Sequence, residues 1–181
     1  MIKVMRFGHR KGRDTRITTH VGLVARAFGA DEFILANTDA KGPLQTITDI
    51  CSRWGGAEFK TGTVTNWKKA ITDFQKNGGV VCHLTMYGMP LSDSLPKLQQ
   101  HLGQKKNLLV FVGAEKVPSE IYDLVDFNVA VGNQPHSEVG ALAVFLDRLL
   151  DGRPVEDTSR FSDAKLSIVP QEHGKKTLEK T

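Results

Sequence analysis

Residues 108–112 read LLVFV, a run that is apolar at every position. A second run, VVCHL at residues 80–84, has nearly the same character. Successive side chains of a β-strand point to opposite faces of its sheet. A strand without polar alternation is therefore expected where helices cover both faces of a parallel sheet. These two runs predict central strands of such a sheet.

Outward from these runs, strand-like segments alternate with amphipathic segments over the first 150 residues. This alternation indicates an α/β fold with a mostly parallel sheet of about six strands and helices on both faces. The expected strands are 2–7, 32–36, 57–60, 79–84, 107–112 and 127–131. The expected helices are 19–28, 44–54, 67–75, 91–101, 118–122 and 137–150.

The composition changes after Gly152, where a polar segment with a proline precedes a strand-like alternation at 164–169. We therefore expect one α/β domain over residues 1–151 and a small extension, a hairpin with a basic tail, over 152–181. The apolar stripe of the helix at 137–150 fits packing against the core, and part of it fits burial against a partner subunit.

The length of 181 residues suits one domain with a sizeable core. No segment approaches the roughly 20 apolar residues of a membrane helix, so no membrane contact is expected. The first 14 residues become charged too early for the apolar core of a signal peptide, which favours a cytoplasmic chain. The two cysteines form no CxxC pair and the six histidines show no zinc spacing, so neither disulfides nor a metal site are expected.

The net charge of +4 is unevenly distributed. Residues 1–30 carry seven basic side chains against one acidic side chain, and the rest of the chain is slightly acidic. Within this stretch, the segment 8–20 contains Arg10, Arg13 and Arg16 between glycines and threonines. A solvated charged loop explains such a run, but guanidinium groups also donate planar pairs of hydrogen bonds to phosphates. The segment is therefore a candidate nucleic-acid contact, and Thr18 or Thr19 is expected to cap the helix that follows.

Three segments follow predicted strands at their carboxyl ends, where open parallel sheets bind their ligands. They span 83–90, 112–118 and 131–138, and each contains a glycine and a proline. Ordinary turns use the same residues, but three such segments together suggest one composite pocket. Ser137 is expected to cap the last long helix, with Glu138 in its first turn. The phosphate-binding patterns GxxxxGK[ST] and GxGxxG are absent, which disfavours a P-loop enzyme or a typical nicotinamide dehydrogenase.

Three motifs resemble a known family. GHRxxRDxRxTTHV at 8–21, VGAEKVPxEIY at 112–122 and VAVGNQPHSEVGALAVFLDRLL at 129–150 are similar to the archaeal tRNA (cytidine-56) 2'-O-ribose methyltransferases. That family belongs to the SpoU branch of the SPOUT methyltransferases. The likeness covers about residues 3–150. Asn133 and Ser137 lie four residues apart here, whereas the wider SpoU class has a shorter Asn-x-Ser motif.

The resemblance implies a C-terminal trefoil knot, S-adenosyl-L-methionine as cofactor, and a homodimer whose subunits complete each other's sites. Carried over by position, the implied cofactor-binding residues are Leu84, Gly113, Ala114, Glu115, Lys116, Val117, Val131, Gly132, Asn133, Gln134, Pro135, His136, Ser137 and Glu138.

The implied activity is methylation of a ribose 2'-hydroxyl in tRNA at cytidine 56. We expect Arg16 to act as the catalytic arginine, which positions a phosphate and stabilises an oxyanion. Arg10 and Arg13 are expected to bind RNA, and His20 is a candidate general base or a packed residue at the helix start. The alternatives are methylation of another RNA or position, and a non-catalytic RNA-binding α/β protein.

Overall fold

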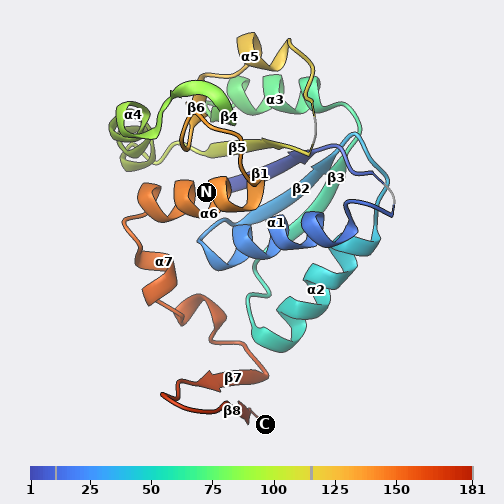
Figure 1. Ribbon diagram of the computed structural model, residues 1–181, viewed down its shortest axis with the longest axis vertical. Coiled ribbons are helices and arrows are strands. Elements are labelled where there is room, and N and C mark those ends of the chain that lie inside the picture. Colours follow the sequence, from blue (N-terminus) through green and yellow to red (C-terminus); the bar gives the residue numbers. More distant parts are fainter. Residues whose placement is uncertain (11, 115, 181) are drawn as a thin grey trace.

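The computed structural model describes residues 1–10, 12–114 and 116–180 (Figure 1). Its central sheet has six strands in the order β3-β2-β1-β5-β4-β6, and every neighbouring pair is parallel. The strands are β1 (Ile2–Phe7), β2 (Glu32–Ala36), β3 (Lys60–Val64), β4 (Val80–Pro90), β5 (Leu108–Gly113) and β6 (Phe127–Ala130). The predicted α/β class with a parallel sheet is confirmed.

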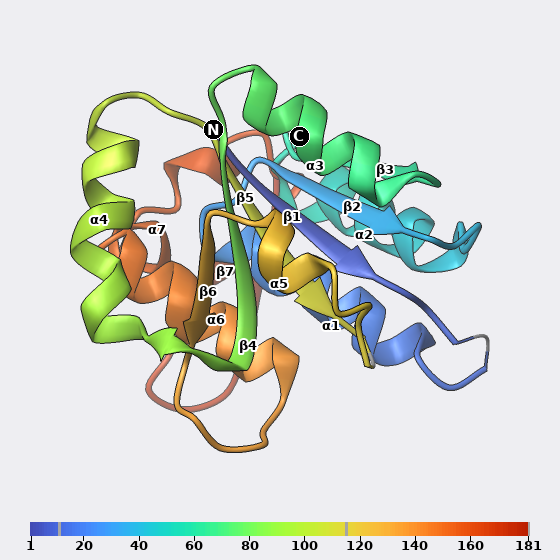
Figure 2. The ribbon, with the colours of Figure 1, turned by 90° about the horizontal axis from the view of Figure 1, so that it is seen from above.

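Helices cover both faces of the sheet (Figures 1 and 2). α3 and α5 lie on one face, and α1, α2, α4 and α6 pack on the other. The longer helices are α1 (Thr15–Ala27), α2 (Gly42–Trp54), α3 (Trp67–Lys76), α4 (Leu91–Gly103) and α6 (Glu138–Leu149). The shorter ones are α5 (Ile121–Leu124), α7 (Arg153–Glu156) and the 3₁₀ helix η1 (Ser159–Phe161).

Two cores explain the continuous apolar run of β5. Leu108, Val110 and Val112 enter the core beneath α1, α2, α4 and α6, whereas Leu109 and Phe111 enter the core beneath α3 and α5. Consecutive residues are thus buried on opposite faces, as the strand geometry requires. No helix within the described parts of the chain has the length and apolar character needed to span a bilayer.

Three predicted elements, β3, α1 and α5, begin three or four residues from their expected starts, and α5 begins at Ile121 instead of 118. β3 is Lys60–Val64, not 57–60, because Phe59 N–H bonds to the carbonyl of Gly56 and closes a turn before the strand. α1 begins at Thr15, so Thr18 and Thr19 lie inside the helix and the predicted cap is wrong. The helix starts at this point because the carbonyl of Asp14 accepts the first helical hydrogen bond, from Thr18 N–H at 2.8 Å.

The segment 83–90, expected as a loop after the fourth strand, lies within β4. β4 pairs with β6 in two registers, with Leu84 opposite Val129 and then Met89 opposite the same residue. The residues between these two points bulge out of the ladder, which is how a strand can redirect side chains beside a site.

The last thirty residues contain α7, η1 and an antiparallel hairpin of β7 (Leu166–Val169) and β8 (Lys176–Glu179). The carboxylate of Asp163 accepts hydrogen bonds from the backbone N–H groups of Gly56 and Ala57, at 2.7 and 2.9 Å. Arg26 places its guanidinium 4.3 Å from the ring centre of Phe161. These contacts attach the segment where β3 begins, at the edge of the sheet opposite the carboxyl ends of the strands (Figure 1).

Candidate functional site

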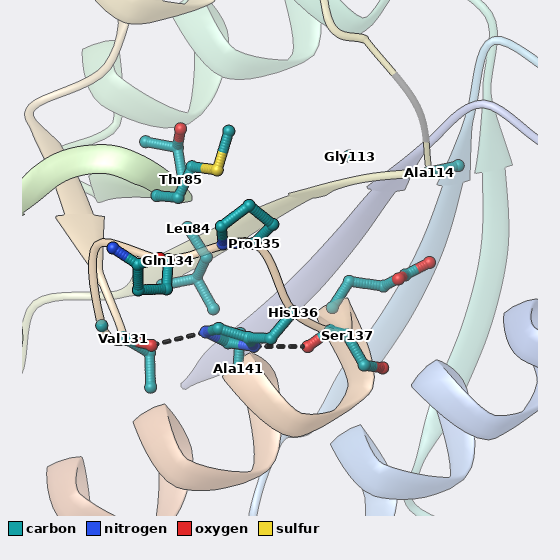
Figure 3. A pocket seen from close by; sticks show the side chains of 13 residues that line it. Leu84, Thr85, Gly113, Ala114, Val131, Gln134, Pro135, His136, Ser137 and Ala141 are labelled. Atoms are coloured by element: carbon teal, nitrogen blue, oxygen red, sulfur yellow. Dashed lines mark hydrogen bonds between the residues drawn. The ribbon is translucent and has the colours of Figure 1, made fainter.

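A cleft lies at the carboxyl ends of β4, β5 and β6, where the three predicted segments meet (Figure 3). Its first hollow has a volume of about 300 Å³. The residues that line it are Leu84, Thr85, Met86, Gly113, Ala114, Val131, Gly132, Gln134, Pro135, His136, Ser137, Glu138 and Ala141. The structure therefore brings ten of the fourteen predicted cofactor residues to one hollow.

A second hollow of about 930 Å³ adjoins the first on the side of α5. The two hollows share Leu84, Thr85, Met86 and Gly113, so they adjoin each other, and the two together are called the cleft. Lys116 and Val117 line the second hollow, together with Tyr122 from α5. Asn133 lines neither hollow, and Glu115 lies outside the described residues.

Asn133 holds two walls of the cleft together. Its side-chain amide donates to the carbonyl oxygens of Met86, at 2.8 Å, and Gly88, at 3.0 Å. These carbonyls belong to the bulge of β4, which has left the regular ladder. The amide thus fixes the segment 131–138 against the segment 84–90, which the sequence did not indicate.

Replacing Asn133 by alanine is expected to weaken cofactor binding more than stability. Both carbonyls lie at an exposed rim where water can replace the amide, so the loss of stability should be about 1 kcal/mol. The loosened wall should raise the Kd of the expected cofactor, S-adenosylmethionine, about tenfold, because binding must then also supply the free energy that orders the loop. Calorimetry and thermal unfolding measure the two effects. An unchanged Kd would contradict the bridging role.

The ring of His136 links the beginning of the segment 131–138 to its end. Its Nε2 lies 2.6 Å from the carbonyl oxygen of Val131 and its Nδ1 lies 3.1 Å from that of Ser137 (Figure 3). The hydroxyl of Ser137 accepts a hydrogen bond from Val139 N–H at 3.2 Å. Ser137 is thereby confirmed as the N-cap of α6, with Glu138 in the first turn.

The basic segment runs from the end of β1 into α1. Arg10 donates from Nε and Nη2 to the carboxylate of Asp14, at 3.0 and 2.9 Å, and its backbone N–H donates to the same carboxylate. Arg13, Arg16 and His20 are exposed. Their side chains have no hydrogen-bond or ion-pair partner within the described ranges, so they are available to a ligand. Arg16 and His20, four residues apart, share a face of α1.

The hydrogen bonds from Arg10 lower the pKa of the buried Asp14 carboxyl from 3.8 to about 2. A carboxyl group whose pKa is lower in the folded protein than in the unfolded chain stabilises the fold at pH values above its unfolded pKa. This contribution is lost as the pH falls from about 4 toward 2. Because Arg10 is partly exposed, we expect a contribution of about 1–2 kcal/mol.

Denaturant unfolding of the wild type and of Asp14→Asn at several pH values tests this expectation. The wild type should be the more stable protein at pH 7, and the difference should shrink below pH 4. A difference that is constant over this range would show that the ion pair does not contribute.

Arg6 also belongs to the site, although from the sequence it was counted only among the seven basic residues of 1–30. It lies in β1 with no exposed surface. Its Nη2 donates to Glu138 Oε1 at 3.0 Å, and its Nη1 donates to Thr18 Oγ1 at 2.7 Å and to the carbonyl of Gly8 at 2.9 Å. The signal in the sequence was an arginine among the apolar residues near the end of the strand IKVMRF, in which only Lys3 is not buried.

Comparison with known families gives one match over most of the chain. The family described as tRNA ribose 2'-O-methyltransferase, aTrm56, matches residues 54–178. A relative from Thermococcus kodakarensis is 53% identical over 179 residues, which cover 99% of this chain and 97% of the relative. A relative from Thermofilum pendens is 51% identical, covering 95% and 92% of the two chains. Both are named tRNA (cytidine(56)-2'-O)-methyltransferase.

Solved structures share the fold at low sequence identity. A probable methyltransferase from Bordetella pertussis aligns with a TM-score of 0.60 at 14% identity, over 83% of this chain and 93% of that chain. The SpoU methyltransferase AviRb from Streptomyces viridochromogenes, solved in complex with AdoMet, aligns with a TM-score of 0.56 at 14% identity. That alignment covers 83% of this chain and 57% of AviRb. These neighbours confirm the fold class.

Proposed function

The chain belongs to the tRNA ribose 2'-O-methyltransferase family aTrm56, and we propose that it transfers a methyl group from S-adenosylmethionine to the ribose 2'-hydroxyl of cytidine 56 in tRNA. The observation that carries this proposal is that the motifs typical of the family lie together at one cleft. The two motifs that follow β5 and β6 line one cleft at the carboxyl ends of parallel strands. Relatives of this chain that share about half of its residues are named for that reaction.

The cleft suits the cofactor in size and in chemistry. Ligand sites of small molecules commonly have volumes of about 300–1,000 Å³, and the two hollows fall in this range. Leu84 and Val117 offer apolar surface to an adenine ring, and the backbone of 131–138 offers donors and acceptors to its edge. Glu138 lines the first hollow, and its carboxylate, paired with Arg6, keeps 23% of its side chain exposed to a ligand there.

We assign RNA binding and catalysis to four side chains of the basic segment, Arg10, Arg13, Arg16 and His20. Bound in the cleft, S-adenosylmethionine supplies a methyl group made electrophilic by its positively charged sulfur. The chain must hold the 2'-oxygen in line at about 3–3.5 Å and assist the loss of its proton. We assign the oxyanion and its adjacent phosphate to Arg16, with His20 as candidate base. Arg13 would then bind the RNA backbone, and Arg10, whose Nε and Nη2 are held by Asp14, would add its remaining N–H groups.

The proposal includes a trefoil knot and a homodimer. The family to which the chain belongs supports the knot. Tyr87 and Met89 on β4 and Val144 on α6 are large hydrophobic side chains that are exposed, which supports a partner subunit.

We further propose that residues 1–151 form the catalytic domain and that 152–181 form an extension. A protein that acts on tRNA is expected in the cytoplasm.

Methyl transfer to an unmodified tRNA transcript tests the proposed function. The protein, incubated with the transcript and methyl-labelled S-adenosylmethionine, should place label in the RNA. A transcript with 2'-deoxycytidine at position 56 lacks the acceptor oxygen and should stay unlabelled. Salt-sensitive RNA binding without label in either transcript would favour a non-catalytic RNA-binding protein.

A further inference from the structure

Arg6 is a charged side chain buried in a strand that otherwise faces two apolar cores. Taking a charge out of water is costly, and the cost is offset only where the charge is paired and hydrogen-bonded. Val4 precedes Arg6 by two positions and faces the core beneath α1 and α6. Arg6 therefore projects from β1 toward the same two helices.

The guanidinium of Arg6 joins the cofactor cleft to the first helix. On one side Nη2 binds Glu138, which lines the first hollow and keeps 23% of its side chain exposed. On the other side Nη1 binds Thr18, in the second turn of α1. The hydroxyl of Thr18 also lies 2.9 Å from His9 Nδ1, so the contacts continue into the basic segment.

The planar shape of the guanidinium matters for this connection. One rigid group holds an acceptor from α1, the carbonyl of Gly8 and an acceptor from α6 at fixed relative positions. Glu138 faces the predicted cofactor, and the exposed face of α1 carries Arg16 and His20. A shift of about 1 Å between two such groups is enough to lower a reaction rate about 10²-fold.

We propose that Arg6 is a positioning residue for methyl transfer: it holds Glu138 at the cofactor cleft and Thr18 of α1 in one fixed arrangement. The inference rests on the proposed function for its turnover measurements. Its binding measurements need only S-adenosylmethionine and the protein. Arg6 itself touches neither cofactor nor RNA in this account, since its side chain is fully buried.

The chain offers a matched control in Arg26. This second arginine is also buried, and Nε has no partner in either arginine among the described residues. Arg26 donates to the carbonyls of Trp54 and Gly55, at the opposite edge of the sheet. Arg6→Lys and Arg26→Lys both keep the charge and remove the planar donor set, so both should lower the Tm.

Arg6→Lys should raise the Kd of S-adenosylmethionine about tenfold and lower kcat for tRNA by about 10–100-fold, measured well below the Tm. Arg26→Lys should leave both quantities unchanged. Glu138→Gln and the double variant complete a cycle. If Arg6 acts through Glu138, Arg6→Lys should add little to the Kd once Glu138 has been replaced.

Thr18→Val provides a second test that leaves Arg6 in place. It removes one acceptor without changing the shape of the side chain, so kcat should fall while the cofactor Kd stays unchanged. If Arg6→Lys does not fold, a lower kcat at an unchanged Kd in Thr18→Val tests the positioning role by itself.

Three results would overturn the inference. Arg6→Lys and Arg26→Lys could change Kd and kcat alike, the effects of Arg6→Lys and Glu138→Gln on Kd could multiply, or Thr18→Val could retain full turnover. A wild type that binds cofactor but never methylates tRNA contradicts the proposed function instead.

Discussion

Replacing Arg16 by alanine is expected to lower kcat for tRNA methylation about 10²–10³-fold, the usual loss when one stabilising donor to an oxyanion is removed. The Kd of S-adenosylmethionine should stay unchanged, because Arg16 does not line either hollow of the cleft. Stability should also be retained, since the side chain is exposed and has no partner within the described ranges. Single-turnover methyl transfer and calorimetry separate these three effects.

Arg53→Ala is a suitable control for this experiment. Arg53 is likewise an exposed arginine on a helix, but it lies in the last turn of α2, near the attachment of the C-terminal segment. Its loss should change neither turnover nor cofactor affinity. Full turnover in Arg16→Ala would transfer the catalytic role to another residue, and His20→Ala would be the next variant to measure.

Replacing Gly88 by alanine is expected to have the largest effect on stability. The added Cβ would lie 2.5 Å from the carbonyl carbon of Asn128 and from the backbone nitrogen of Val129. Backbone atoms in a paired strand cannot move aside as a flexible side chain does, so β4 and β6 would have to separate. We expect a loss of about 2–3 kcal/mol, which lowers the Tm of a chain of this size by about 5–10 °C.

Gly103→Ala controls for the loss of a glycine as such. Gly103 ends α4, and no described atom lies within 4 Å of an added Cβ. This variant should unfold at the wild-type temperature or slightly above it. A Tm of Gly88→Ala equal to that of Gly103→Ala would mean that the two strands are not held as tightly as the structure indicates.

The role of Gly88 also corrects the sequence analysis. The glycines of the three segments were expected to belong to ordinary turns or to one composite pocket. At Gly88 the close neighbour is instead the backbone of β6, which belongs to the same sheet. Nothing local distinguishes these two needs for a glycine, because both arise from atoms that are distant in the sequence.

The central strands could be predicted because burial on both faces leaves a continuous apolar run, as at 108–112. β3 was misplaced because it is an edge strand with the polar sequence KTGTV, which lacks that signal. The start of α1 was missed because its first turn is exposed and charged, so apolar periodicity begins only later.

The three cleft segments could also be predicted, since parallel strands bring their carboxyl ends to one edge of the sheet. The contacts that shape the cleft could not. Arg6 and Glu138 are 132 residues apart, and Asn133 reaches Met86 across 47 residues. Such hydrogen bonds depend on how the elements pack. The family was recognisable from whole motifs and is confirmed by the comparisons.

Mapping the methylated nucleotide tests the central claim most directly. An unmodified tRNA transcript is incubated with the protein and S-adenosylmethionine, digested, and analysed by mass spectrometry for ribose-methylated nucleotides. We predict a single methyl group on the ribose of cytidine 56, absent without the cofactor. A methyl group at another nucleotide, or on a base, would contradict the assigned reaction.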